Sequence, residues 1–401
     1  MSEVVNIPQL RFPEFETDWE KEKLKNVSTY FNGGSFENDV QVEGRYELVT
    51  LKSINMSGSL VHSKRFIEIE VSTLSKNTLV MILSEQSPGL LGMTALIPID
   101  NKYVLNQRVA EIRPNDNVDS YFLSMSINRN QRYFGKHGAG TKVQNLSKPN
   151  VENYEFLCPT KPEQQKIAAF LTAVDNKIEQ LSKKQELLGE YKKGAMQQIF
   201  SQATRFKADD GSNFPDWEEV KLGNLTHKVG KKNKENIKYP IYSINNQEGF
   251  RPQSEQFDGL DSNDRGYDIS LYKIVNEKTF AYNPARINVG SIGYSYNLNK
   301  VIVSSLYVCF KTNDELEDLY LLAYLDTDKF NKDILRYEEG GVRQYLFYEN
   351  FSQISIPLPG NDEQAKISNF LSSIDNKIEQ VDKQLDESKQ FKKALLQQMF
   401  V

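Results

Sequence analysis

Cysteine and histidine are scarce in this chain, and their scarcity leaves few ways to build a reactive or metal-binding site. Among 401 residues there are two cysteines, far apart, and three histidines scattered between them and before them. They are Cys158, Cys309, His62, His137 and His227. The pattern offers no disulfide framework, no metal-ligand cluster and no Cys–His pair. We therefore expect no disulfide and no metal site.

Long apolar runs and a strong net charge are also missing. No apolar run approaches the roughly 18 residues that a membrane span requires, and no secretory segment is recognisable. The chain is therefore expected to be cytoplasmic and to have no membrane partner. The net charge of −5 gives no basic field over the whole molecule, so any contact with nucleic acid must come from local patches.

Motifs of catalysis are absent as well. The chain has no Gly-x-x-x-x-Gly-Lys phosphate loop and no clear nuclease set of carboxylates and lysine. Asn283-Pro284 continues with Ala285, so it fails the Asn/Asp-Pro-Pro-aromatic motif of amino-methyltransferases. We expect no catalytic residue in this chain.

The chain does contain a long segment that occurs twice, 200 residues apart. The run Glu-Gln-x-Lys-Ile-x-x-Phe-Leu-x-x-x-Asp-Asn-Lys-Ile-Glu-Gln begins at Glu163 and again at Glu363. Both copies continue to Lys-Lys, Gln-Gln and a closing Phe, and about half of this stretch of roughly forty residues is identical. The segments before each copy agree far less. The pattern indicates like spacers that carry two unlike heads.

A second echo marks where each head begins. Asp-Trp-Glu-x-x-Lys-Leu occurs around Trp19 and around Trp217, the only tryptophans of the chain, and Phe-Pro precedes both. We interpret each tryptophan as a packing anchor. The order is therefore head, helix, head, helix, with boundaries at 1–160, 161–201, 202–360 and 361–401.

Short β-rich runs dominate each head and are separated by Gly, Pro, Asn and Asp, as turns require. The runs are 46–51, 78–83, 95–99 and 104–112 in the first head, and 241–244, 279–282, 291–296 and 301–311 in the second. A helical stretch follows in each, at 118–132 and 316–335, and then a strand ending in proline, at 154–159 and 354–359. The fold class is mixed α+β, with two α/β heads.

The repeated segments are predicted to be long helices because apolar residues recur at spacings of three and four. Pro162 suits a first helical turn, and about 36 residues would span on the order of 55 Å. The narrow stripe fits a coiled-coil seam, so the two helices are expected to pair antiparallel in a pseudo-twofold arrangement. The alternative is that each helix packs only on its own head. The packing residues are Ile167, Phe170, Leu171, Val174, Ile178, Leu181, Ile367, Phe370, Leu371, Ile374, Ile378 and Val381.

The repeated motif, following a strand that ends in proline, resembles the conserved regions of type I restriction–modification specificity subunits. Gly140-Thr141 and Gln144-Asn145-Leu146-Ser147 before the first helix support the resemblance. The second copy departs there, with Gly340-Gly341-Val342-Arg343-Gln344-Tyr345.

The resemblance implies a non-catalytic DNA reader. Each head would be a target-recognition domain that reads one half of a split, asymmetric site in double-stranded DNA. The helices would set the gap between the half-sites and dock two copies of the methylation subunit, and a restriction subunit would join. No cofactor is expected in this chain, whereas the partners would use S-adenosylmethionine, ATP and Mg.

Candidate DNA contacts in the first head cluster in a basic, Gly-rich region, 120–151, that contains no acid. Glycine lets the backbone approach a phosphate, lysine neutralises the phosphate, and Gln or Asn can pair with a base edge. A solvated basic surface is the alternative. The candidates are Arg129, Arg132, Lys136, His137, Thr141, Lys142, Gln144 and Asn145, with Gln86 from an earlier turn.

Candidates in the second head come from three places. A lysine-rich segment, 228–238, would supply phosphate contacts, although a solvated loop would look the same in sequence. A polar loop after Asn283-Pro284 corresponds to the turn that holds Gln86. The third place is around Arg343, which could bind guanine or could pair with Glu338 or Glu339. The candidates are Lys231, Lys232, Arg286, Asn288, Ser291, Tyr294, Arg343, Gln344 and Tyr345.

The sequence therefore favours a DNA specificity subunit. The alternatives are a coiled-coil adaptor whose two heads bind proteins, and a chain that itself methylates DNA.

Overall fold

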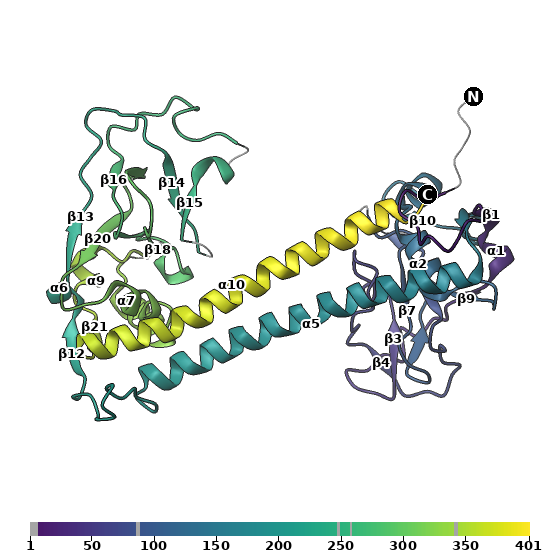
Figure 1. The fold of residues 1–401 in the computed structure, drawn as a ribbon, viewed down its shortest axis with the longest axis horizontal. Helices are drawn as coiled ribbons and strands as arrows, with labels where there is room; N and C mark the ends of the chain where they lie inside the picture. Colours follow the sequence, from purple (N-terminus) through teal and green to yellow (C-terminus); the bar gives the residue numbers. More distant parts are fainter. Residues whose placement is uncertain (1–6, 86–88, 247–248, 257–258, 341–343) are drawn as a thin grey trace. The chain divides into compact units, whose positions relative to one another are not determined.

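The structure is a computed structural model that describes residues 7–401 except 86–88, 247–248, 257–258 and 341–343 (Figure 1). The chain divides into two compact units. The first consists of Met1–Ser182 with Lys383–Val401, and the second of Lys183–Asp382. Each unit therefore contains one head, the first half of that head's own long helix and the last half of the other long helix.

The first head contains two small sheets. In the larger sheet the strands are antiparallel in the order β2-β9-β5-β7, and the smaller has the order β4-β3-β8, with β3 and β8 parallel. Two short pairs, β1-β11 and β10-β6, complete it. The elements are β1 (Glu20–Lys23), α1 (Leu24–Val27), β2 (Ser28–Asn32), β3 (Tyr46–Val49), β4 (Phe66–Ile67), β5 (Leu79–Ile82), β6 (Ser84–Glu85), β7 (Thr94–Leu96), β8 (Tyr103–Leu105), β9 (Val109–Pro114), α2 (Ser120–Asn128), α3 (Gln131–His137), β10 (Gln144–Asn145), α4 (Lys148–Glu152) and β11 (Glu155–Cys158).

The second head has a similar plan, but both of its sheets have four strands. The strand orders are β13-β20-β17-β18 and β15-β14-β19-β16, and β12 pairs with β21. The elements are β12 (Glu218–Lys221), α6 (Leu222–Leu225), β13 (Thr226–Val229), β14 (Ile241–Ile244), β15 (Phe250–Pro252), η1 (Gln253–Glu255), β16 (Lys273–Val275), β17 (Phe280–Tyr282), η2 (Ile287–Val289), β18 (Ile292–Tyr294), β19 (Val301–Val303), β20 (Val308–Thr312), α7 (Asp318–Tyr324), α8 (Asp328–Tyr337), α9 (Tyr348–Phe351) and β21 (Ser355–Leu358).

Several predicted elements are shorter than the sequence suggested, because turns interrupt them. The run 104–112 is two strands, β8 and β9, separated by a turn in which Arg108 takes the left-handed conformation at φ 66°. The run 301–311 divides in the same way into β19 and β20. The helical stretch 316–335 is also two helices, because the Thr327 hydroxyl accepts from Phe330 N and starts a new helix. The stretch 118–132 likewise breaks between α2 and α3.

The two long helices are α5 (Lys161–Phe200) and α10 (Asn361–Gln398), as the repeat predicted. Within each unit they run alongside one another (Figure 1). In the first unit Asp175 of α5 forms an ion pair with Lys392 of α10 at 2.6 Å. In the second unit Asp375 of α10 pairs with Lys192 of α5, also at 2.6 Å. These residues occupy the same places in the two copies of the repeat, so both units use the same antiparallel helix pairing.

The helices pack on their own heads as well as on each other. In the first unit Ile167 and Leu171 lie in one buried core with Trp19 of the head and with Met399 and Phe400 of the C-terminal end. The second core contains the matching set: Ile367, Leu371, Ile374, Met196 and Ile199. At the helix ends the apolar stripe therefore contacts both the other helix and the helix's own head, so both interpretations of the stripe apply there.

The predicted packing residues do not all face the helix seam. Phe170 is 36% exposed and meets Phe12 edge-on at 6.0 Å, and Phe370 meets Phe206 at 5.6 Å. Both rings contact the chain segment that leads into a head, and Phe370 also packs against the core of the second unit. The others are buried or half-buried on the inner face: Val174, Ile178, Leu181, Ile378 and Val381. Among the described residues, no helix is both long and apolar enough to cross a membrane.

Candidate nucleic-acid interface

The glutamate of the repeated motif ties each head to its long helix. Glu163 is 1% exposed, and its carboxylate accepts two bonds from the Arg11 guanidinium, both at 2.8 Å. The indole Nε1 of Trp19 donates to the same carboxylate at 3.3 Å. This tryptophan is therefore an anchor, as predicted, and its polar atom has a charged partner.

The second unit repeats this arrangement. Glu363 is fully buried and accepts from the Arg205 guanidinium at 3.2 and 2.8 Å and from Trp217 Nε1 at 2.8 Å. The two arginines were missed in the sequence, although an Arg-Phe dipeptide precedes each tryptophan and could have revealed them.

The glutamine of the motif closes the junction between helix and head. Gln164 accepts from Asp119 N at 2.8 Å and donates to Pro159 O at 2.8 Å. Gln364 makes the same two bonds, with Glu317 N and Pro359 O, both at 2.8 Å. The motif that identifies the repeat is therefore a structural joint, and the surface that could meet DNA lies elsewhere in the heads.

In the first head the structure joins the two loops that the sequence singled out separately. Strand β6 pairs antiparallel with β10, so that Glu85 faces Gln144 and Ser84 faces Asn145. One carboxylate oxygen of Glu85 accepts three backbone bonds, from Gly89 N, Leu90 N and Leu91 N at 3.0, 2.8 and 2.8 Å. These bonds hold the backbone of residues 89–91 against the end of β6, whereas Gln86 lies outside the described residues.

The second head pairs the corresponding loops. Leu346 N donates to Pro284 O at 3.0 Å, as Leu146 N donates to Leu83 O at 2.8 Å in the first head. Arg286 and Asn288 are exposed on this loop, and so is Gln344 across from it. Arg343 lies outside the described residues. Each head therefore presents a surface made of two paired loops, which we call the paired-loop surface and which consists of the described residues of 84–91 with 138–146, and of 283–291 with 339–347.

Four exposed candidates of the first head form no hydrogen bond or ion pair with the described residues: Arg132, Lys136, Thr141 and Lys142. Three others already have partners inside their own unit. Arg129 donates to Val401 O at 2.6 Å and lies over the Phe400 ring, and burial lowers the pKa of its guanidinium. His137 Nδ1 bonds with Tyr133 O at 2.8 Å. Asn145 accepts from the Ser84 hydroxyl and donates to Val143 O.

The candidates of the second head divide in the same way. Lys231 and Lys232 are exposed between β13 and β14. The backbone of Lys232 forms an isolated antiparallel β-bridge with Lys273 of β16. Burial lowers the pKa of the Lys273 ammonium, and the nearby Lys228 and Lys232 lower it further, although Lys228 also forms an ion pair with Glu349 at 3.0 Å. Tyr345 is half-buried and its ring stacks on Phe347.

Two polar candidates of the second head are engaged in structural bonds. Ser291 is 3% exposed and donates to Ile244 O at 2.7 Å. The Tyr294 hydroxyl donates to Asp318 at 2.5 Å, and burial together with this bond raises the pKa of the phenol. To reach DNA, either side chain would have to give up its present partner.

Outside the heads, the two long helices expose a set of residues that is identical in both copies. Asn176, Lys177, Glu179 and Gln180 are exposed in the first unit, as are Asn376, Lys377, Glu379 and Gln380 in the second. Their side chains form no hydrogen bond or ion pair within the described part of the chain. An exposed aromatic ring accompanies each set, Phe391 in the first unit and Tyr191 in the second.

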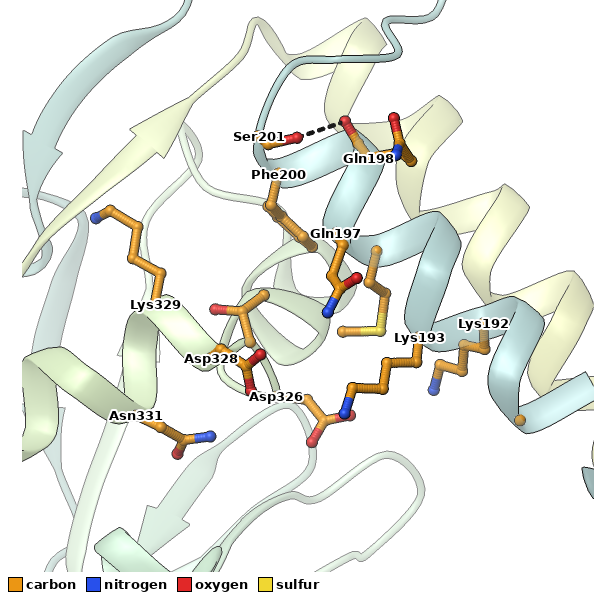
Figure 2. A pocket seen from close by; sticks show the side chains of 13 residues that line it. Lys192, Lys193, Gln197, Gln198, Phe200, Ser201, Asp326, Asp328, Lys329 and Asn331 are labelled. Atoms are coloured by element: carbon orange, nitrogen blue, oxygen red, sulfur yellow. Dashed lines mark hydrogen bonds between the residues drawn. The ribbon is translucent and has the colours of Figure 1, made fainter.

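The second unit also has a hollow of about 710 Å³ beside the end of α5. Figure 2 shows Lys193, Asp326 and Asp328 around it, whereas Ser201 bonds back to Gln198 at 3.2 Å. None of the predicted DNA contacts lines it. Within the described ranges, no His, Cys, Asp and Glu side chains gather in a group that could hold a metal ion.

One protein-family model matches the chain twice, once in each half of its sequence. The model described as "Type I restriction modification DNA specificity domain" matches residues 16–188 and again 215–388. The putative type I restriction enzyme MjaX specificity subunit of Methanocaldococcus jannaschii is 24% identical over 417 residues, which cover 98% of this chain and 95% of that protein. The MjaVIII specificity subunit of the same organism is 22% identical, with 96% and 92% covered.

Solved structures show the same fold. The type I restriction–modification S subunit from M. genitalium has a TM-score of 0.64 at 18% identity, over 98% of this chain and 99% of that one. A chain from a study of complex assembly and conformational transition of the type I R-M system has a TM-score of 0.52 at 16% identity, with 96% and 97% covered.

Proposed function

This chain belongs to the type I restriction modification DNA specificity domain family, and we propose that each of its two heads reads one half of a bipartite, asymmetric DNA site. Its role in a restriction–modification complex is recognition of DNA sequence, and the chemistry belongs to other subunits. The observation that carries the proposal is the paired-loop surface, which occurs once in each head on the same backbone frame with different side chains.

Two unlike readers on one chain are physically sensible. A single head can cover only a few base pairs, and discrimination grows as separate contacts add. A fixed spacer between two readers defines a gap between half-sites, as dimer geometry does in other DNA-binding proteins. We assign the spacer role to α5 and α10.

Partner docking is supported by the exposed residues that the two helix copies share. Packing explains why buried residues are repeated, but it does not explain the repeated Asn-Lys-x-Glu-Gln face. A face that is presented once in each unit suits two copies of one partner, and we identify that partner as the methylation subunit. A restriction subunit would then join, and these partners would bring S-adenosylmethionine, ATP and Mg.

Salt dependence tests the DNA role. Capture through several phosphates should weaken steeply as salt rises, whereas protein contacts of an adaptor would not. In the complex with its methylation subunits, Lys142→Gln should reduce the slope of log affinity against log salt by about 0.9 if Lys142 contacts one phosphate. Lys184→Gln, an exposed lysine of α5, is the matched control. Binding that does not respond to salt would rule out the DNA role.

Head exchange tests the independence of the two readers. Replacing residues 24–159 by the first head of a related chain should alter one half of the recognised site and leave the other half unchanged. Sequencing of modified bases in cells that carry the chain and its partners gives the answer. If both halves change together, the heads do not read separately.

Charge reversal tests the proposed docking face. Lys177→Glu should weaken binding of one methylation subunit, Lys377→Glu that of the other, and the double variant both. The masses of the purified complexes report the losses. Lys184→Glu is the control, because the second copy has Gln384 at that place. Complexes of unchanged mass would show that the partner binds elsewhere.

A further inference from the structure

The loop that contains Gln144 in the first head and the loop that contains Gln344 in the second are closed by the same pair of backbone hydrogen bonds. Ala139 and Asn145 exchange two backbone bonds at 3.0 and 2.9 Å, and Glu339 and Tyr345 exchange the same two at 2.9 and 2.8 Å. Gly140 and Gly340 take left-handed conformations, with φ of 124° and 132°. Gln144 and Gln344 therefore both lie immediately before the residue that closes this pair of bonds, Asn145 or Tyr345.

After the shared glycine, only one position of this loop is the same in the two heads. Residues 142–145 read Lys-Val-Gln-Asn, and residues 342–345 read Val-Arg-Gln-Tyr. The glutamine is shared, although its neighbours on both sides are not. A residue that stays the same while the residues directly before and after it change has a task common to both heads.

The shared glutamine has no structural bond to explain it. Gln144 is half-buried and Gln344 is exposed, and neither side-chain amide hydrogen-bonds with any described residue. Gln144 lies beside the backbone of Gly138, where an added Cβ would come within 3.1 Å of the amide oxygen. This differs from Asn145, whose amide bonds with Ser84 and Val143.

We propose that Gln144 and Gln344 bind the DNA sugar–phosphate backbone, one in each half-site, and place both heads on the duplex in the same way. This inference rests on the proposed function. Two heads that read unlike base sequences share only the backbone of the duplex as a common ligand. A glutamine NH₂ group donates well to a phosphate oxygen, and contacts of this kind set position without reading sequence. Discrimination then falls to the variable neighbours.

The competing reading is that each glutamine pairs with a base present in both half-sites. Glutamine forms two bonds with the edge of adenine in the major groove, and such a pair discriminates strongly against other bases. The two readings differ in what a substitution changes: overall affinity in the first, preference at one base pair in the second.

The test uses the complex with methylation subunits and duplexes that carry the mapped site or single-base changes in it. Gln144→Ala should weaken binding about tenfold for every duplex in the panel, as loss of a hydrogen bond to a charged group does. Gln344→Ala should do the same. Gln144→Lys should restore affinity and steepen the salt slope by about 0.9, because it adds a charged phosphate contact.

Several outcomes would overturn the inference. Unchanged affinity of Gln144→Ala would show that the side chain makes no contact, and a lost preference at one base pair would show that it reads a base. Gln41→Ala, an exposed glutamine of the first head outside the paired loops, is the control, and thermal unfolding checks that each variant folds. Failure of the unaltered complex to bind DNA would instead refute the proposed function.

Discussion

The Glu-Gln pair that opens each copy of the repeat joins a long helix to its head. Glu163 and Glu363 are buried against arginine and tryptophan, and Gln164 and Gln364 satisfy backbone groups at the helix start. A buried carboxylate needs such partners because an uncompensated charge in the interior is costly. The motif therefore reports the joint between head and helix.

Removing the charge at this joint should destabilise one unit. Glu163→Gln leaves the Arg11 guanidinium, only 12% exposed, without its counterion, and we expect a loss of about 3 kcal/mol in the free energy of unfolding. Urea denaturation followed by Trp19 fluorescence in a Trp217→Phe background measures it. Glu179→Gln, on the exposed helix face, should change stability by less than about 0.5 kcal/mol. Equal effects would contradict the buried joint.

At the scale of elements, the two long helices combine three functions along their length. Their ends pack on the heads, their inner stripe holds the other helix, and their outer face repeats the same polar residues. Gly189 and Gly194 do not interrupt α5, although each lowers helix propensity. Tertiary packing of the inner stripe outweighs that cost, as it does in most protein helices.

The cross-helix ion pairs should differ in strength between the units. Asp175 is bound by Lys392 and also accepts the hydroxyl of Tyr121, whereas Asp375 has an ion pair with Lys192 and is 51% exposed. Asp175→Ala should therefore cost about 1.5 kcal/mol and Asp375→Ala about 0.5 kcal/mol. Double-mutant cycles with Lys392→Ala and Lys192→Ala measure both. Equal costs would mean that the Tyr121 bond adds nothing.

Lengthening the helices should lengthen the gap between half-sites. Seven residues inserted after Lys184 and again after Gln384 add about two turns, or roughly 10 Å, to each helix. That is about three base-pair steps of DNA, so the mapped site should gain about three unread base pairs with both halves unchanged. The same insertion after Gln202, in the linker, is the control. An unchanged gap would reject the spacer role.

At the scale of the whole molecule, the two units are built alike although the chain enters them differently. In the second unit the chain runs on from α5 into the head, and Thr204 N donates to Gln198 O at 3.1 Å. In the first unit Leu10 N makes the same bond to Gln398 O at 2.9 Å, although these residues are remote in sequence. The first unit thus has the same hydrogen bond between helix end and head entry as the second unit, although only in the second unit does a continuous linker join the two segments.

A circularly permuted chain should therefore fold and keep its specificity. Joining Val401 directly to Pro8 leaves five residues between Gln398 and Leu10, as between Gln198 and Thr204, and the chain is reopened between Gln202 and Ala203. The permuted protein should modify the same DNA site, and its unfolding midpoint should lie within a few degrees of the parent. Reopening inside α5, at Leu188, is the control that should fail. Loss of folding in the first permutant would contradict the equivalence.

The sequence by itself determined the order of elements. Helical periodicity and repetition are local properties, so both long helices and the tryptophan anchors could be predicted from the chain. The family resemblance rested on the same local identity, and the family match agrees with it. Breaks within elements were missed, because a single turn residue such as Arg108 leaves little trace in a β-rich pattern.

Only the tertiary structure decided which residues meet. Ser84 and Asn145 are 61 positions apart, and Arg11 and Glu163 are 152 apart, so no local pattern pairs them. Hydrogen bonding then separated candidates that look alike in sequence: Ser291 and Asn145 are engaged in bonds within their own heads, whereas the side-chain amides of Gln144 and Gln344 bond with no described residue. Composition supplies polar groups, but the packing of distant segments determines which of them can reach a ligand.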